Sequence, residues 1–414
     1  MPRIARLLHL GPTTGLVLGV LGTLPGVSLG QECLYVLDQL NNQLTAFRRD
    51  SGTEAGSLPM PIDDCPEPPC HPMPTALELS DGPSVRAYVT RQDVNLTYVL
   101  DPIAGTVVDT VDIESGSSPQ AGSSAAALSP DGGTLYVTNL SVDSVSVIDT
   151  GSNELEDTID LRPPAPDRTR PRAVAVTPDG ATVLVANSSG NSVSLIRASD
   201  GGVIDTVAVG RSPAGVAISP GGDEAYVSNG SDGSVSVIDI ANRSVLDTIT
   251  VGESPRGVAY SPDGTMVYVT NVLSRTVSVI NTTSREVVGD PITVGPAPIA
   301  IVVTDDGSTA YVANLMGNTI SEINLTNRAV DTIPDVTAPF DLAFGPCPST
   351  TGPCVGDCDG DGVVMVNELI AGVNIALGNQ PLSVCPEFDP SGDGMVGINE
   401  LIQAVNNALL GCPS

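Results

Sequence analysis

Tyr268-Val269-Thr270-Asn271 is the clearest copy of a motif that recurs at regular intervals along this chain. Successive copies begin 53, 48, 48, 42, 42 and 43 residues apart, a period typical of repeated supersecondary units. Most copies combine aromatic and β-branched residues, which favour extended strands. The seven copies are Tyr35–Asp38, Tyr88–Arg91, Tyr136–Asn139, Leu184–Asn187, Tyr226–Asn229, Tyr268–Asn271 and Tyr311–Asn314.

The residues around each motif predict four short strands in every repeat. Pro255–Tyr260 is an apolar stretch, and Ser261–Gly264 is a turn in which proline fixes φ and glycine permits a positive φ. Val267–Asn271 and Thr276–Ile280 predict the second and third strands, and Val287–Val294 predicts the fourth. A four-stranded sheet is too small to be stable alone, so the repeats must stack face to face. The sequence therefore predicts a mainly-β fold, a seven-bladed β-propeller over residues 31–345.

The two ends of the repeat region predict how the ring closes. Leu34–Asp38 is a second strand without a first strand before it, and Pro339–Phe344 is a first strand without a blade after it. Together they complete a split first blade; six or eight blades fit this arrangement less well. Aligned with an intact repeat, Cys33 and Cys347 face each other across the missing turn, so we expect them to form a disulfide. The competing pair is Cys347 with Cys354.

Seven phased motifs give residues 33–345 a resemblance to the YVTN family of β-propeller repeats. That resemblance implies the propeller fold, and the family includes surface-layer and other exported proteins. It does not imply an activity, because one fold supports many functions.

The N-terminal 30 residues are typical of a signal peptide. Arg3 and Arg6 precede the short apolar stretch Gly15–Leu24, and the small residues of Ser28–Gly30 predict cleavage before Gln31. We therefore expect a secreted or cell-surface protein with no membrane span. In an exported chain the even number of cysteines favours disulfides. A local Cys65–Cys70 pair is expected, and the pairing of the last four is left open; the eight are Cys33, Cys65, Cys70, Cys347, Cys354, Cys358, Cys385 and Cys412.

Composition excludes several functions. The net charge of -31 disfavours nucleic acid as a partner, because phosphates would be repelled. The chain has only two histidines, and His9 leaves with the signal peptide, so a Ser-His-Asp triad would require His71. No nucleophile elbow, zinc-protease motif or phosphate-binding loop is present.

After a linker, residues 346–353, residues 354–414 contain two acidic loops that match the EF-hand pattern. In each loop, side chains at positions one, three and five, the carbonyl at seven and the glutamate at twelve would surround one calcium ion. The sequence therefore predicts two calcium ions. The predicted ligands are Asp357, Asp359, Asp361, Val363 and Glu368 in the first loop, and Asp389, Ser391, Asp393, Met395 and Glu400 in the second.

A helix is expected after each loop, and the two helices should pack their apolar faces together. This duplicated loop and helix resembles a type I dockerin, which implies calcium binding and a cohesin-like receptor. The sequence departs from that family at Met365 and Gly397, and in its partner-reading pairs, Val366-Asn367 and Ile398-Asn399. Calcium binding therefore carries over better than cohesin recognition. The expected apolar faces are Leu369, Ile370, Val373, Ala376 and Leu377, and Leu401, Ile402, Val405, Ala408 and Leu409.

These features favour a secreted, non-catalytic binding or scaffold protein, and no catalytic residue is assigned. The propeller would be the interaction face for a protein or a cell-surface glycan, and the calcium module would serve assembly or anchoring. The scarcity of histidine predicts no turnover of generic esters and lactones. The alternative is an exported propeller hydrolase of lactonase type with a carboxylate-metal site in the central channel. The lining of that channel distinguishes the two.

The calcium prediction is tested by titrating the segment Cys354–Ser414 with calcium in a calorimeter. Two ions should bind, and Glu368→Gln should impair one site selectively because it removes a charge and the bidentate geometry. Calcium should also raise the melting temperature, since the ion binds the folded state. No heat of binding at millimolar calcium would contradict the prediction.

Overall fold

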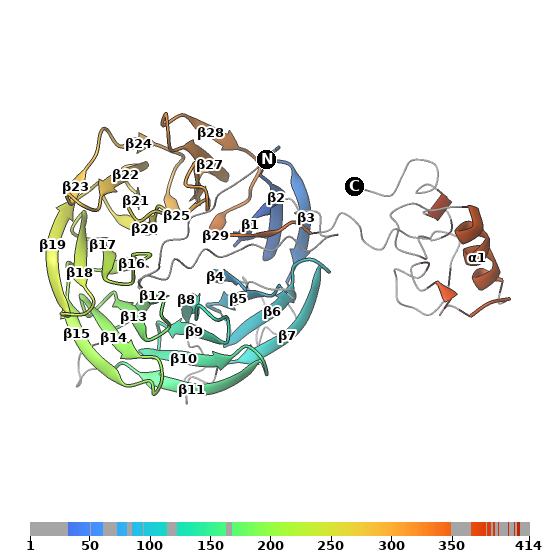
Figure 1. Ribbon diagram of the computed structural model, residues 1–414, viewed down its shortest axis with the longest axis horizontal. Helices are drawn as coiled ribbons and strands as arrows, with labels where there is room; N and C mark the ends of the chain where they lie inside the picture. The colour runs from blue at the N-terminus through green and yellow to red at the C-terminus, as the bar shows by residue number, and fades with distance from the viewer. Residues whose placement is uncertain are drawn as a thin grey trace, which may run out of the picture. The chain divides into compact units, whose positions relative to one another are not determined.

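The computed structural model describes residues 32–49, 51–60, 73–80, 85–93, 95–113, 122–162, 168–348 and 366–377, and residues 379–381, 384, 385, 388, 396, 401, 404 and 405. Seven antiparallel sheets surround a common axis (Figure 1). The predicted seven-bladed, mainly-β propeller is therefore confirmed. We number the blades in the chain order of their second strands, which carry the repeated motif.

Every blade runs from an inner first strand to an outer fourth strand. Blade 1 consists of β29 (Pro339–Pro346), β1 (Glu32–Asp38), β2 (Gln43–Arg48) and β3 (Glu54–Pro59), and blade 2 of β4 (Pro74–Leu79), β5 (Ala87–Arg91), β6 (Leu96–Asp101) and β7 (Thr106–Asp112). Blade 3 consists of β8 (Ser123–Leu128), β9 (Thr134–Asn139), β10 (Ser144–Asp149) and β11 (Glu154–Asp160), and blade 4 of β12 (Pro171–Val176), β13 (Thr182–Asn187), β14 (Ser192–Arg197) and β15 (Val203–Ala208).

Blades 5 to 7 follow the same order, and blade 6 differs at its edge. Blade 5 consists of β16 (Pro213–Ile218), β17 (Glu224–Asn229), β18 (Ser234–Asp239) and β19 (Ser244–Thr250). Blade 6 consists of β20 (Pro255–Tyr260), β21 (Met266–Asn271), β22 (Thr276–Asn281), β23 (Glu286–Val287) and β24 (Ile292–Thr293), and blade 7 of β25 (Pro298–Val303), β26 (Thr309–Asn314), β27 (Thr319–Asn324) and β28 (Val330–Ile333). The single strand expected at Val287–Val294 is two short strands, because Gly289 has φ 68° and Pro291 has no N–H for the ladder.

Blade stacking supplies the hydrophobic core. Seven clusters of buried side chains lie one between each pair of neighbouring blades. The valines of the motif, such as Val137, Val227 and Val312, have no exposed surface. Each blade therefore needs a neighbour on both faces, and only a closed ring provides that.

The terminal asparagine of the motif fastens the second strand to the third. Asn229 Nδ2 donates to Ser234 Oγ at 3.1 Å and to Ser236 Oγ at 2.9 Å. Asn139, Asn187, Asn271 and Asn314 make the same two bonds to the hydroxyls five and seven residues later. The amide is buried in every case, so its donor group must find such partners.

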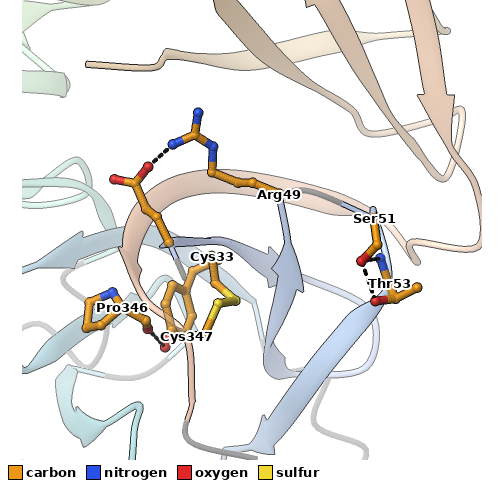
Figure 2. The surroundings of a disulfide bond; sticks show 8 residues. Cys33, Arg49, Ser51, Thr53, Pro346 and Cys347 are labelled. Atoms are coloured by element: carbon orange, nitrogen blue, oxygen red, sulfur yellow. Dashed lines mark hydrogen bonds and ion pairs between the residues drawn. A yellow bond between two sulfur atoms is a disulfide. The ribbon is translucent and has the colours of Figure 1, made fainter. Parts of the chain in front are cut away.

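The split first blade closes as predicted. β29 pairs antiparallel with β1, from Glu32 opposite Pro346 to Asp38 opposite Pro339. Cys33 and Cys347 form a disulfide with their Cα atoms 4.7 Å apart, and Tyr35 Oη donates to the carbonyl of Pro346 at 2.7 Å (Figure 2). Cys347 therefore does not pair with Cys354.

The C-terminal segment has a small core of its own. The helix α1 (Val366–Ala376) places Ile375 against Phe388 and Ala404, so parts of both predicted repeats share one cluster. The expected inward face of this helix is wrong in part, because Ile370, Val373 and Leu377 are exposed. Gly372 explains the difference: a Cβ there would lie 2.2 Å from Phe388, so the ring packs directly on the helix backbone.

Several predictions concern residues outside the described ones. They include the signal peptide 1–30, most of the linker 346–353, and cysteines 65, 70, 354, 358 and 412. Cys385 is disulfide-bonded. In the part of the chain that the structure describes, no helix is long and apolar enough to cross a membrane.

The Cys33–Cys347 disulfide is called the clasp below. Replacing both of its cysteines, Cys33→Ser with Cys347→Ser, should lower the melting temperature of the full chain. The chain-entropy model gives about 5 kcal/mol for so long a loop, as an upper value. The matched control is Cys65→Ser with Cys70→Ser, because a loop of only a few residues should cost about 2 kcal/mol in the same model. Thermal unfolding in which the clasp variant matches the parent would refute a stabilising clasp.

Candidate functional site in the central channel

The first strands of the seven blades surround the axis of the ring. β29, β4, β8, β12, β16, β20 and β25 each contact the next in that order, and β25 contacts β29 again (Figure 1). Their side chains are mostly small or apolar. Four charged residues are the exceptions: Glu78, Arg172, Arg256 and Asp341.

Asp341 joins the inner strands of blades 1 and 2. Its Oδ2 accepts a hydrogen bond from the backbone N–H of Leu77 at 3.0 Å, and its Oδ1 accepts one from Leu342 N–H at 2.9 Å. Desolvation raises the pKa of this carboxyl to about 6, although the two N–H groups and the charge of Arg256 oppose the shift. Asp341 is therefore mostly ionised at neutral pH.

Glu78 follows Leu77 in β4, and the negative charge of Asp341 affects the pKa of its carboxyl. Desolvation, and then the negative charge of Asp341, raise the pKa of Glu78 to about 8. At neutral pH Glu78 is therefore mostly protonated beside an ionised neighbour. Two carboxyls with separated pKa values are the arrangement that supplies a general acid and a general base together.

The two arginines bring positive charge into the channel. Arg256 Cζ lies 4.9 Å from the centre of the Phe340 ring, so this side chain of blade 6 reaches toward blade 1. Desolvation, and then the charge of Arg172, lower the pKa of Arg256 to about 10, against the influence of Asp341. Burial also lowers the pKa of Arg172. Within the described residues neither guanidinium has a hydrogen bond or an ion pair, so both are suited to bind an anion.

The alternative function expected a carboxylate-metal cluster in the channel. Among the residues that the structure describes, no group of three or more His, Cys, Asp or Glu could hold a metal ion. The described lining instead combines two carboxyls with two guanidiniums. The sequence did carry a signal that was overlooked, because Arg172, Arg256, Glu78 and Asp341 each interrupt an otherwise apolar first strand.

The predicted calcium ligands are mostly outside the described residues. Glu368 is the exception: it lies in the first turn of α1 with 4% of its surface exposed. The described residues therefore do not test whether the predicted ligands come together. The nine others, Asp357, Asp359, Asp361, Val363, Asp389, Ser391, Asp393, Met395 and Glu400, are not described.

Comparison with known proteins agrees with the fold. A family model described as "Lactonase, 7-bladed beta-propeller" matches residues 101–207 and 199–288. No curated protein matches the sequence. The chain is a seven-bladed β-propeller with similarity to this lactonase family over its central blades.

Three solved structures show the same architecture at identities that establish the fold alone. A functionally unknown protein from Desulfotomaculum acetoxidans DSM 771 is 16% identical, with TM-score 0.61, over 75% of this chain and 98% of that one. A putative 6-phosphogluconolactonase from Bacteroides uniformis is 16% identical, with TM-score 0.58, over 76% and 100%. Virginiamycin B lyase from Staphylococcus aureus is 15% identical, with TM-score 0.56, over 66% and 92%.

The raised pKa of Glu78 predicts how stability depends on pH. From its ordinary value of 4.5 up to about 8, the folded state holds a proton that the unfolded chain releases. The contribution of Glu78 to the free energy of unfolding is therefore fully present below pH 4.5 and is lost as the pH rises through about 8. A glutamine at this position has no proton to release in this range, so the melting temperature of Glu78→Gln should rise relative to that of the parent as the pH rises from 5 to 8.

The matched control is Glu154→Gln, at an exposed residue of β11. Its melting temperature should follow that of the parent at every pH. If Glu78→Gln behaved like Glu154→Gln, the raised pKa of Glu78 would be refuted.

Proposed function

We propose that the propeller is a hydrolase of the lactonase type that opens a cyclic ester bearing an anionic group within the central channel. The observation that carries this proposal is the meeting of Glu78, Asp341, Arg172 and Arg256 in a channel whose other inner-strand residues are mostly small or apolar. The lactonase family model over the central blades supports it. The alternative weighed from the sequence is thus preferred to the scaffold.

The four groups have complementary roles in lactone opening. Ionised Asp341 is the general base that takes a proton from water as the oxygen attacks the ester carbonyl. Protonated Glu78 is the general acid that gives its proton to the ring oxygen as the carbon–oxygen bond breaks. Arg256 stabilises the negative charge that develops on the carbonyl oxygen, and Arg172 binds the anionic substituent. The product is the open hydroxy acid, and water is the only co-reactant.

Calcium binding by the C-terminal segment remains a second proposal. The shared cluster of Ile375, Phe388 and Ala404 supports a single folded unit formed from both predicted repeats. Export by the signal peptide, two calcium ions, and anchoring to a protein, a cell-surface glycan or a cohesin-like receptor complete this proposal. It is compatible with catalysis, because the module would hold an enzyme in place as well as a scaffold.

The function is tested with lactones that carry a carboxylate or a phosphate, next to a neutral lactone of the same ring size. The anionic substrates should be hydrolysed faster, with kcat/KM rising above pH about 6 and falling above about 8. Glu78→Gln should lower kcat/KM by about 10²- to 10⁴-fold, the usual contribution of a general acid. Glu154→Gln should have no effect. Absence of turnover with every anionic lactone would contradict the proposal.

A further inference from the structure

One face of the propeller carries exposed apolar side chains on three neighbouring blades. They are Leu40, Leu273 and Met316, whose exposed fractions are 71%, 68% and 79%. Each is the second residue after a copy of the repeated motif, and the second strands that carry this motif all run the same way along the axis, so the three lie on one face. Their blades, 1, 6 and 7, are consecutive around the ring (Figure 1). We call these three residues the apolar crescent.

The other four blades have polar residues at the equivalent position. The motif itself therefore does not require an apolar side chain there. Single exposed apolar side chains are common on protein surfaces, whereas a row of them on one side of one face is typical of an interaction site. The polar equivalents are Asp93, Ser141, Ser189 and Ser231.

The backbone holds the apolar crescent in place. The residue before each member, Gln39, Val272 or Leu315, donates its N–H to a carbonyl of the crossover that enters its blade, at 3.2, 3.0 and 3.0 Å. The turn of blade 7 also packs closely on that crossover, because a Cβ on Gly317 would lie 2.9 Å from Pro296 Cδ. The three turns are therefore already ordered, so a partner pays little entropy to bind them.

The turns of the apolar crescent contain no acidic residue, although the chain has a net charge of -31. Residues 39–42, 272–275 and 315–318 include one charged side chain, Arg275. Two copies of so acidic a chain repel each other, so a contact between copies is favoured where acidic side chains are missing. Three of the four equivalent turns in the other blades contain an aspartate: Asp93, Asp143 and Asp232.

Two exposed charged residues lie on opposite sides of Met316. Arg275 ends the turn of blade 6. Asp335 belongs to the crossover from blade 7 to blade 1, and the next residue, Val336, donates its N–H to the carbonyl of Asn318 in the turn of blade 7 at 3.2 Å. Among the described residues neither charged side chain has an ion pair. Both charges are therefore available to a partner.

We propose that the apolar crescent is the interface of a symmetric dimer of this chain. In such a dimer the same surface of both copies forms the contact. A two-fold axis through Met316 brings the two Met316 side chains together and sets Leu273 of one copy opposite Leu40 of the other. The same axis pairs Arg275 with Asp335 of the other copy, twice. The dimer does not depend on the activity proposed for the channel.

The test is sedimentation equilibrium of the full chain from about 0.1 to 100 µM. A small apolar interface should give a dissociation constant of about 1 to 100 µM. Leu273→Ser with Met316→Ser should weaken dimerisation at least about tenfold, because two apolar contacts are lost on each copy. The control is Leu246→Ser, at an exposed leucine of β19, which should dimerise as the parent does. A parent that is monomeric throughout this range, or a site variant that dimerises as well as the control, would overturn the proposal.

Exchanging the charges tests the two-fold arrangement. Arg275→Asp and Asp335→Arg should each weaken self-association about tenfold, because like charges then face each other. An equimolar mixture of the two variants should restore dimers, because every facing pair again joins an arginine and an aspartate. The substitutions suit the backbone: the two positions have φ 56° and 60°, which aspartate tolerates and arginine already adopts at one of them. A mixture that stays monomeric would overturn the arrangement.

Two other outcomes would assign the contact elsewhere. A monomer that sediments with phosphatidylcholine vesicles, and loses this binding in Leu273→Ser with Met316→Ser, would make the apolar crescent a membrane-binding surface and overturn the dimer. Self-association through the C-terminal segment would persist in every crescent and charge variant, and it would overturn the dimer as well.

Discussion

The antiparallel pairing of β29 with β1 is the contact on which the rest of the molecule depends. Each blade has two apolar faces, and each face is buried only by a neighbouring blade. An open ring would expose one face at each end, so the two halves of blade 1 must find each other across the length of the repeat region. The Cys33–Cys347 disulfide makes that pairing covalent, and the ion pair between Arg49 and Glu32 lies beside it (Figure 2).

Closure also assembles the channel site. Asp341 and Phe340 belong to the closing strand β29, while Glu78 lies on β4 and Arg256 on β20. These groups come together only when the last inner strand enters the ring. Burial of Glu78 and Asp341 in the closed ring raises the pKa of both carboxyls, so the pairing that stabilises the ring also sets their charge.

The sequence predicts the fold well because the propeller is a repeat, and each Tyr-Val-Thr-Asn copy marks one second strand. Alignment with one intact blade was also enough to place Cys33 opposite Cys347. It could not show that Leu77 meets Asp341, 264 residues away, because that contact follows from closure and not from local pattern. Periodicity likewise misplaced Ile370 and Val373, since it does not register the direct packing of Phe388 on Gly372.

The clasp has a mechanical consequence. Cys33 lies at the start of β1 and Cys347 directly follows the end of β29, so the disulfide joins the two paired strands at the end where the chain enters the first and leaves the second. Tension between the segment before Cys33 and the segment after Cys347 would run through a single sulfur–sulfur bond, and the load would bypass the hydrogen bonds of all seven blades. While the bond is intact, a pull on the C-terminal segment moves the ring as one body; once it is reduced, the same pull would peel β29 from β1 one hydrogen bond at a time.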